Sequence, residues 1–206
     1  MTIPHIEICY AWFLDPVYRL AFKARTRARK GKYPAPLKIA QQVERYRRAW
    51  KRKEMPLLQA LQKALGLQFS HNRIDVYIVG RGQSISNPVV ISSRREPDEF
   101  VDVLTHELIH RLLAENREGS DVLRIVNRCF KGESRSTKIH IAVHAVHAFL
   151  YLDVLNAPDR LKRDVEQCKA LPPAYSRSWH IVQEAGYKGI IDLLRKTSTE
   201  KTASHR

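Results

Sequence analysis

The sequence has few cysteines, no long hydrophobic run and no motif of a known nucleic-acid-binding fold. Cys9, Cys129 and Cys168 are the only cysteines among 206 residues, and no two of them form a CxxC pair. This spacing excludes a disulfide framework and a cysteine zinc finger, and it favours a reducing compartment, so we expect a cytoplasmic location. No stretch of 18 apolar residues is present, so we expect no transmembrane segment.

Acidic residues are nearly missing from one segment, Arg19 to Lys53. It holds fourteen Lys or Arg residues against one acid, Glu44, a net charge of +13, whereas the rest of the chain carries +2. A charge this local favours an anionic partner, which can be DNA, RNA or a membrane surface. A solvated arm from Arg19 to about Lys32, followed by a charged helix face, is the alternative. The candidate nucleic-acid contacts are Arg25, Arg27, Arg29, Lys30, Arg47, Arg48, Lys51 and Arg52.

Hydrophobic periodicity predicts an α+β fold with a small mixed sheet in the first half of the chain. Apolar residues alternate with other residues near 6–12 and 74–79, and 89–91 is a short apolar run after a turn, which together predict three strands. After Pro36, apolar positions at helical spacing from Ile39 to Leu65 predict a helix that ends at Gly66 and that Pro56 kinks or splits.

The second half of the chain is predicted to be helical throughout. Ser93 and Glu96 have the spacing of a capping box at the start of the first of these helices. The predicted helices cover 97–116, 120–131, 137–156, 158–169 and a stretch from Ala174 that is interrupted at Gly186. We expect one domain over 1–196 and a polar, disordered tail at 197–206.

An HExxH motif, His106-Glu107-Leu108-Ile109-His110, lies within the helix predicted at 97–116. Histidines four residues apart lie about 40° apart on one face of a helix, so both imidazoles can bind one zinc ion. Glu107 points about 100° away from His106, where its carboxylate can take a proton from zinc-bound water. The alternative is a half-buried helix with two solvated histidines.

A catalytic zinc site needs three protein ligands and an open position for water, so another element must supply the third ligand. The helix predicted at 137–156 carries His140, His144 and His147 on one stripe. His144 is the preferred ligand because it is central in the stripe, His140 is the alternative, and His147 follows. A histidine that does not bind the metal would orient a ligand, contact substrate or fill the core.

Through the segment EFVDVLTHELIHRLL, Glu99 to Leu113, the chain resembles the zincin metallopeptidases, specifically small forms that are SprT-like or minigluzincin-like. It departs from the metzincin pattern because Leu113 and Asn116 stand where that pattern has a glycine and its third histidine. It also departs from the gluzincin pattern, in which a glutamate on a later helix is the third ligand. A third ligand from a later histidine is similar to the SprT-type zincins.

The resemblance implies a zincin-like fold and a zinc-dependent peptidase with His106 and His110 as ligands and Glu107 as general base. It also implies that an extended protein or peptide substrate adds to the strand before the active-site helix, here Asn87 to Ser92. Tyr151 is a candidate hydrogen-bond donor to the oxyanion. The basic segment would place such an enzyme on nucleic acid or another polyanion.

Two alternatives to this function stay open. The first is a non-catalytic nucleic-acid-binding protein that keeps a zincin-like fold. The second is a regulatory or toxin-like protease with one dedicated protein substrate, which differs from a general peptidase in substrate breadth alone.

Overall fold

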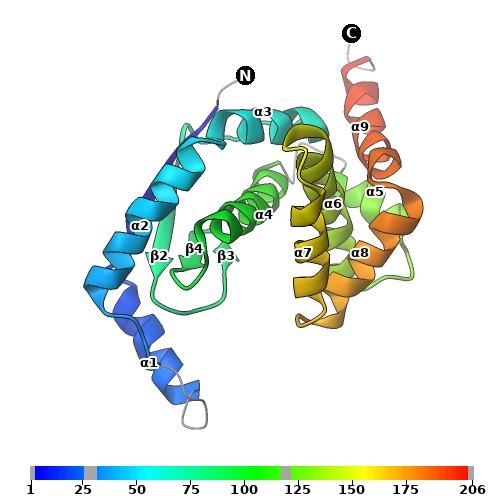
Figure 1. The fold of residues 1–206 in the computed structure, drawn as a ribbon. Helices are drawn as coiled ribbons and strands as arrows, with labels where there is room; N and C mark the ends of the chain where they lie inside the picture. The colour runs from blue at the N-terminus through cyan, green and yellow to red at the C-terminus, as the bar shows by residue number, and fades with distance from the viewer. Residues whose placement is uncertain (1–2, 26–31, 117–121, 204–206) are drawn as a thin grey trace. The chain divides into compact units, whose positions relative to one another are not determined.

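The computed structural model describes residues 3–25, 32–116 and 122–203, with the backbone alone for 196–203 (Figure 1). The chain divides into two compact units. We call Thr2–Met55 with His71–Arg111 the sheet unit, and Pro56–Ser70 with Leu112–Arg206 and Met1 the helical unit. The predicted α+β class and small mixed sheet are confirmed.

The sheet unit is built on a four-stranded sheet in the order β1-β2-β4-β3. β1 (His5–Tyr10) and β4 (Val89–Ser92) run parallel to β2 (Arg73–Val79), and β3 (Ile85–Ser86) pairs antiparallel with β4. The register places Ile8, Val76 and Val89 side by side across three strands, and all three are buried. Side chains at matched positions point to one face of a sheet, so this row forms part of its core.

The strand that was expected to bind substrate has a neighbour on each side. Val89 and Val90 pair with β2 on one side and with β3 on the other. Strand addition needs an edge whose backbone groups are unpaired. The expectation that substrate adds along Asn87 to Ser92 is therefore wrong for Val89 and Val90, and the edge strand on this side of the sheet is β3.

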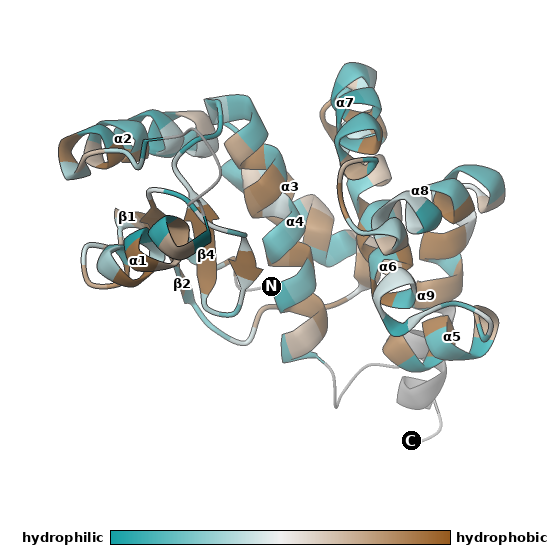
Figure 2. Cartoon of the chain, turned by 90° about the horizontal axis from the view of Figure 1, so that it is seen from below, coloured by the Kyte–Doolittle hydropathy of each residue, from teal (hydrophilic) through white to brown (hydrophobic). Residues whose placement is uncertain are grey.

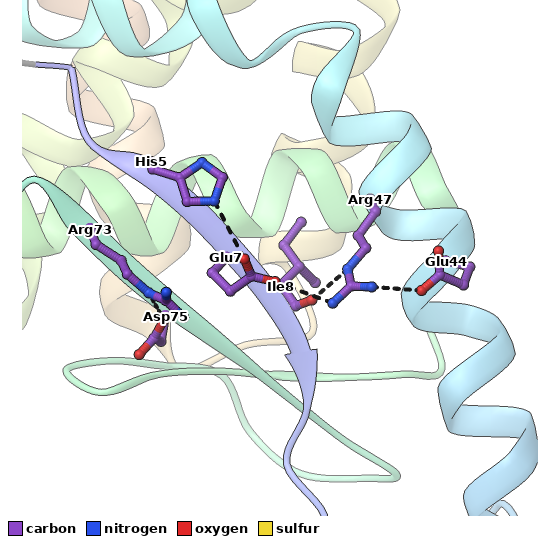
Figure 3. Close-up of polar contacts among 7 residues, drawn as sticks. All are labelled: His5, Glu7, Ile8, Glu44, Arg47, Arg73 and Asp75. Atoms are coloured by element: carbon purple, nitrogen blue, oxygen red, sulfur yellow. Dashed lines mark hydrogen bonds and ion pairs between the residues drawn. The ribbon is translucent and has the colours of Figure 1, made fainter.

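Helix α2 (Pro36–Lys51) lies against β1, and Arg47 ties the two together (Figure 3). Its guanidinium donates to the Ile8 carbonyl at 2.8 Å and forms ion pairs with Glu7 at 3.2 Å and Glu44 at 2.7 Å. The positive charge of Arg47 is therefore paired with carboxylates inside the sheet unit, where Arg47 also holds α2 against β1.

Helix α4 (Pro97–Glu115) belongs to the sheet unit up to Arg111, and α2 supports its start. The Tyr46 ring stacks on the Phe100 ring, with centroids 3.9 Å apart and planes within 3°. The predicted capping box is wrong, because the Ser93 hydroxyl donates to the Gly80 carbonyl at 3.1 Å and α4 begins only at Pro97.

Helix α1 (Asp15–Arg25) was not predicted from the sequence, which indicated a basic arm from Arg19. Asp15 is buried, and its Oδ1 accepts hydrogen bonds from the Gly80 N–H at 2.8 Å and the Tyr33 hydroxyl at 2.5 Å. Tyr18 packs against a cluster formed by Ala11, Val79 and Val90. The described part of the arm is thus a helix fixed to the sheet unit, and residues 26–31 lie outside the described residues.

The helical unit is centred on α6 (Arg135–Phe149), ten of whose residues are buried. A helix that is apolar nearly all round belongs in a core. Ser134 caps its start, since the Ser134 hydroxyl accepts from the Thr137 N–H at 3.1 Å. Neighbours of α6 are α5 (Val122–Cys129), α8 (Pro173–Ala185) and α9 (Tyr187–Ala203), and α7 (Pro158–Cys168) contacts α8.

Several predicted helix boundaries are confirmed, one predicted helix is split, and another ends in a π-helical turn. The helix predicted after Pro36 is split, because α2 ends at Lys51 and α3 covers Glu54–Leu65, followed by Gly66 with φ +66°. The helix predicted at 137–156 is α-helical to Phe149 and continues as a π-helical turn, η1 (Leu150–Val154). The backbone of α9 extends to Ala203, into the segment for which polarity predicted a disordered tail.

Candidate metal centre

The HExxH motif forms two successive turns of α4, as its spacing predicts. The Nε2 atoms of His106 and His110 lie 3.1 Å apart, and their ring centroids lie 4.8 Å apart. Both side chains are half-buried. Two ligand nitrogens of one tetrahedral zinc ion lie about 3.3 Å apart when each Zn–N bond is about 2.05 Å. The two imidazoles therefore have the separation that one metal ion requires.

Glu107 lies between the two histidines in sequence and is 9% exposed. Burial disfavours the charged carboxylate and raises the pKa of Glu107 from its ordinary 4.5 to about 7, while the positive charge of Arg95 acts in the opposite direction. A carboxyl group with a pKa near the working pH both accepts and returns a proton readily. The electrostatics of Glu107 thus suit a general base.

Arg95 precedes α4 in the loop after β4, and sequence analysis gave it no role. Burial lowers the pKa of Arg95, and Arg94 lowers it further, whereas the charges of Glu99 and Glu107 raise it. The Arg95 carbonyl accepts hydrogen bonds from Gln42 at 2.8 Å and from the Tyr46 hydroxyl at 2.7 Å. These bonds hold the Arg95 backbone to α2, a contact that no local pattern reveals.

The three histidines of α6 each use Nδ1 for a hydrogen bond inside the helical unit. His140 Nδ1 lies 2.8 Å from the Ser136 carbonyl, and His147 Nδ1 lies 3.1 Å from an Asp164 carboxylate oxygen. A carbonyl oxygen only accepts, so the proton of neutral His140 is on Nδ1, and Nε2 carries the lone pair that a metal needs. Burial also lowers the pKa of His140, which keeps its ring neutral.

His144 is built into the packed core of the helical unit. Its side chain is fully buried, and its ring stacks on Trp179 with centroids 4.2 Å apart and planes within 8°. Its Nδ1 lies 2.9 Å from the Ser178 hydroxyl, which itself donates to the Tyr175 carbonyl. Ser178 is therefore the acceptor from His144. These contacts describe a core histidine, one of the roles expected for a histidine of this stripe that does not bind metal.

His106 and His110 lie in the sheet unit and offer two imidazole nitrogens to one metal ion. The three histidines of α6 lie in the helical unit. Tyr151 is buried in η1, where its ring centroid lies 4.6 Å from that of His147. The motif thus supplies the predicted ligand pair, while the choice of the third ligand among the histidines of α6 and the role of Tyr151 stay predictions.

The residues predicted to contact nucleic acid have different surroundings. Arg25, Arg48, Lys51 and Arg52 are exposed. Arg47 forms the ion pairs with Glu7 and Glu44 described above. Arg27, Arg29 and Lys30 lie outside the described residues.

Comparisons with family models, curated proteins and solved structures find no match to this chain. Within the described part of the chain, no helix has both the length and the apolar character needed to cross a membrane.

Proposed function

We propose that the protein is a zinc-dependent metallopeptidase of zincin-like fold, in which His106, His110 and a histidine of α6 hold the metal and Glu107 is the general base. The observation that carries this proposal is the imidazole pair on α4, with Nε2 atoms 3.1 Å apart, next to a buried carboxylate. The substrate is a protein or a peptide. The three cysteines, all free thiols, support a cytoplasmic location as part of the same proposal.

The donor set suits zinc. Imidazole nitrogens are common zinc ligands, and three protein ligands leave one position of a tetrahedral site open. Among the histidines of α6 we assign His140 as the third ligand in place of His144, because the His144 ring is fully buried and stacks on Trp179. The hydrogen bond from His140 Nδ1 to the Ser136 carbonyl supports this assignment, since zinc-binding histidines commonly donate their other N–H to such an acceptor.

Bound zinc would supply a Lewis acid that acidifies water and polarises a peptide carbonyl. Glu107 accepts a proton on a carboxylate oxygen and delivers it to the nitrogen of the leaving amine. Its burial favours both halves of this cycle near neutral pH, since a pKa of about 7 makes gain and loss of the proton nearly balanced. Arg95 keeps part of the carboxylate ionised, and so ready to accept the proton.

Metal content tests the ligand set. We expect about one zinc ion per chain in the wild-type protein and a loss of zinc in His106→Ala, His110→Ala and His140→Ala. Elemental mass spectrometry of the untagged proteins measures it. The matched control is His180→Ala, because His180 is exposed on α8 and pairs with Glu184. Loss of zinc in His144→Ala together with retention of zinc in His140→Ala would identify His144 as the third ligand.

Activity tests the role of Glu107. We expect Glu107→Gln to keep its zinc and to cleave a peptide library about a hundredfold more slowly or not at all, because the amide cannot accept the proton. Mass-spectrometric detection of cleaved peptides measures the rate. Undiminished cleavage by this variant contradicts the proposal. Zinc binding without cleavage by the wild type would favour a non-catalytic protein, or a protease with one dedicated substrate.

A further inference from the structure

One outward face of the sheet unit carries large apolar side chains that the fold does not cover. Trp12, Phe13, Val17 and Leu20 are 73%, 51%, 62% and 66% exposed, and they account for half of the large exposed hydrophobic residues among those described. They fall within nine consecutive positions: Trp12 and Phe13 precede α1, and Val17 and Leu20 lie on it. Figure 2 shows hydrophobic and hydrophilic residues side by side on α1. We call these four residues the apolar face of α1.

The other side of α1 is held by the sheet unit. Tyr18 lies so close to Gly82 that a Cβ at this glycine would be 2.5 Å from the Tyr18 ring. Asp15 accepts hydrogen bonds from Gly80 and from Tyr33, as described above. These contacts fix how α1 is rotated about its axis. The apolar face therefore stays exposed in the folded unit. Rotation of α1 about its axis to bury this face would break the hydrogen bonds of Asp15.

Basic residues flank the apolar face on both sides. With 100° between successive residues of a helix, Val17 and Leu20 lie 60° apart, Lys23 follows beyond Leu20, and Arg25 follows beyond Val17. Both cations are exposed, as are Ala21 and Ala24 between them. The face thus has an apolar centre with a positive charge along each margin, at one end of the segment that carries the net charge of +13.

We propose that α1, with Trp12 and Phe13, docks on the surface of an anionic phospholipid bilayer. A helix with Trp, Phe or Leu on one face and Lys or Arg beside it lies in the plane of the membrane interface, with the apolar side chains among the acyl chains and the cations at the headgroups. Trp is the side chain that favours this interface most clearly, since its ring is apolar and its N–H is polar.

The apolar face distinguishes this partner from nucleic acid. Phosphates would pair with Lys23 and Arg25, and a base could stack on Trp12, but a nucleic acid offers no apolar phase for Val17 and Leu20. A bilayer accepts both the cations and the aliphatic side chains. This docking does not depend on the metal site, so the proposed peptidase activity and the membrane docking can fail separately.

Trp12 supplies a direct signal for the test. The chain has three tryptophans, and the other two, Trp50 and Trp179, are 2% and 1% exposed. Insertion of Trp12 into the interface shifts tryptophan emission to shorter wavelength. We expect this shift when vesicles of phosphatidylcholine and phosphatidylglycerol are added to the full-length protein, a much smaller shift with phosphatidylcholine alone, and none in Trp12→Ala.

Co-sedimentation with the same vesicles tests which side chains bind. We expect Val17→Ser/Leu20→Ser to bind at least about tenfold more weakly than the wild type, because its cations remain and its apolar contacts are lost. Lys23→Gln/Arg25→Gln should also bind more weakly and lose most of its dependence on salt. Matched controls are Leu171→Ser, which removes an exposed leucine of the helical unit, and Arg128→Gln/Lys131→Gln on and after α5.

Three results would overturn the proposal. The first is the absence of binding to anionic vesicles at low salt. The second is wild-type binding by Val17→Ser/Leu20→Ser together with tight binding of duplex DNA or RNA, which would make the basic residues a nucleic-acid surface. The third is a dimer in sedimentation analysis that Val17→Ser/Leu20→Ser dissociates while vesicle binding stays undetectable, which would make the apolar face a contact with a second copy.

Discussion

The buried carboxylate of Glu107 is costly to the folded chain when it is charged. Its pKa of about 7 lies above its ordinary 4.5, so between these values the folded protein holds a proton that the unfolded chain has lost. The folded state is therefore favoured most below pH 4.5, and this advantage disappears as the pH rises through 7. The buried carboxylate of Glu107 thus lowers the free energy of unfolding above the pH at which it loses its proton.

Glu107→Gln is expected to be more stable than the wild type at pH 8 once zinc is removed from both proteins with a chelator. A shift from 4.5 to about 7 corresponds to a difference on the order of 3 kcal/mol, because the neutral amide avoids the cost of a buried charge. At pH 4.5 the difference should nearly vanish. Urea unfolding at both pH values measures it.

The control for this comparison is Glu184→Gln, which removes a carboxylate that is exposed on α8. This variant should show little pH-dependent change in the free energy of unfolding. Equal stability of Glu107→Gln and the wild type at both pH values would show that the carboxylate is solvated in the folded chain.

Cysteine reactivity is a second property that burial sets at single residues. Cys129 is exposed and Cys168 is buried. Burial and the nearby Asp164 raise the pKa of Cys168 from 9.0 to about 12, which lowers its thiolate fraction at pH 8 about a thousandfold, and the thiolate is the species that reacts. We expect iodoacetamide to modify Cys129 long before Cys168, as measured by peptide mass spectrometry. In urea the two rates should converge, and equal rates in the folded protein would contradict the burial of Cys168.

At the scale of elements, α1 depends on one side chain. Asp15 is 2% exposed, and besides Gly80 and Tyr33 it accepts a hydrogen bond from the Tyr10 hydroxyl at 3.2 Å. Arg19 lies one turn along α1, with its guanidinium 3.6 Å from the Asp15 carboxylate. Asp15 thus links α1 to the ends of β1 and β2, and the orientation of the apolar face follows from it.

Asp15→Ala is expected to destabilise the protein by about 2–4 kcal/mol, because the Gly80 N–H and the Tyr33 hydroxyl lose their acceptor. Asp15→Asn keeps an acceptor oxygen and should lose about half as much. Urea unfolding followed by circular dichroism measures both. A loss below about 0.5 kcal/mol in Asp15→Ala would mean that water replaces the carboxylate.

The pattern of buried residues on each helix explains why some helices were predicted and one was missed. α4 and α6 have buried apolar residues at helical spacing, which is the signal that sequence analysis detects. α1 turns Val17 and Leu20 outward and holds its inner face through Asp15 and Tyr18, so its pattern does not indicate a core-facing helix. The basic residues around it then favoured the interpretation as an arm.

At the scale of the whole molecule, the fold partly neutralises the basic segment. Arg45 pairs with Glu96 at 3.2 Å, Lys53 with Asp98 at 3.0 Å, and Arg47 with Glu7 and Glu44. These partners come mostly from elements distant in sequence, so the net charge of +13 counted along the segment overstates the charge left for a partner. Within this segment, Lys23 and Arg25 at the end of α1 and Arg48 and Lys51 on α2 are exposed.

The sequence by itself determined the α+β class, three of the four strands of the described sheet, most helices, and the paired histidines with Glu107 on one helix. These features are local, because periods of two and 3.6 residues and a four-residue spacing fix which side chains share a face. Only the tertiary structure decided that β4 has two neighbours, that the charge of Arg95 acts on Glu107, that the His144 ring stacks on Trp179, and that the apolar face of α1 is exposed. Each of these depends on contacts between residues far apart in the chain, which no short-range pattern records.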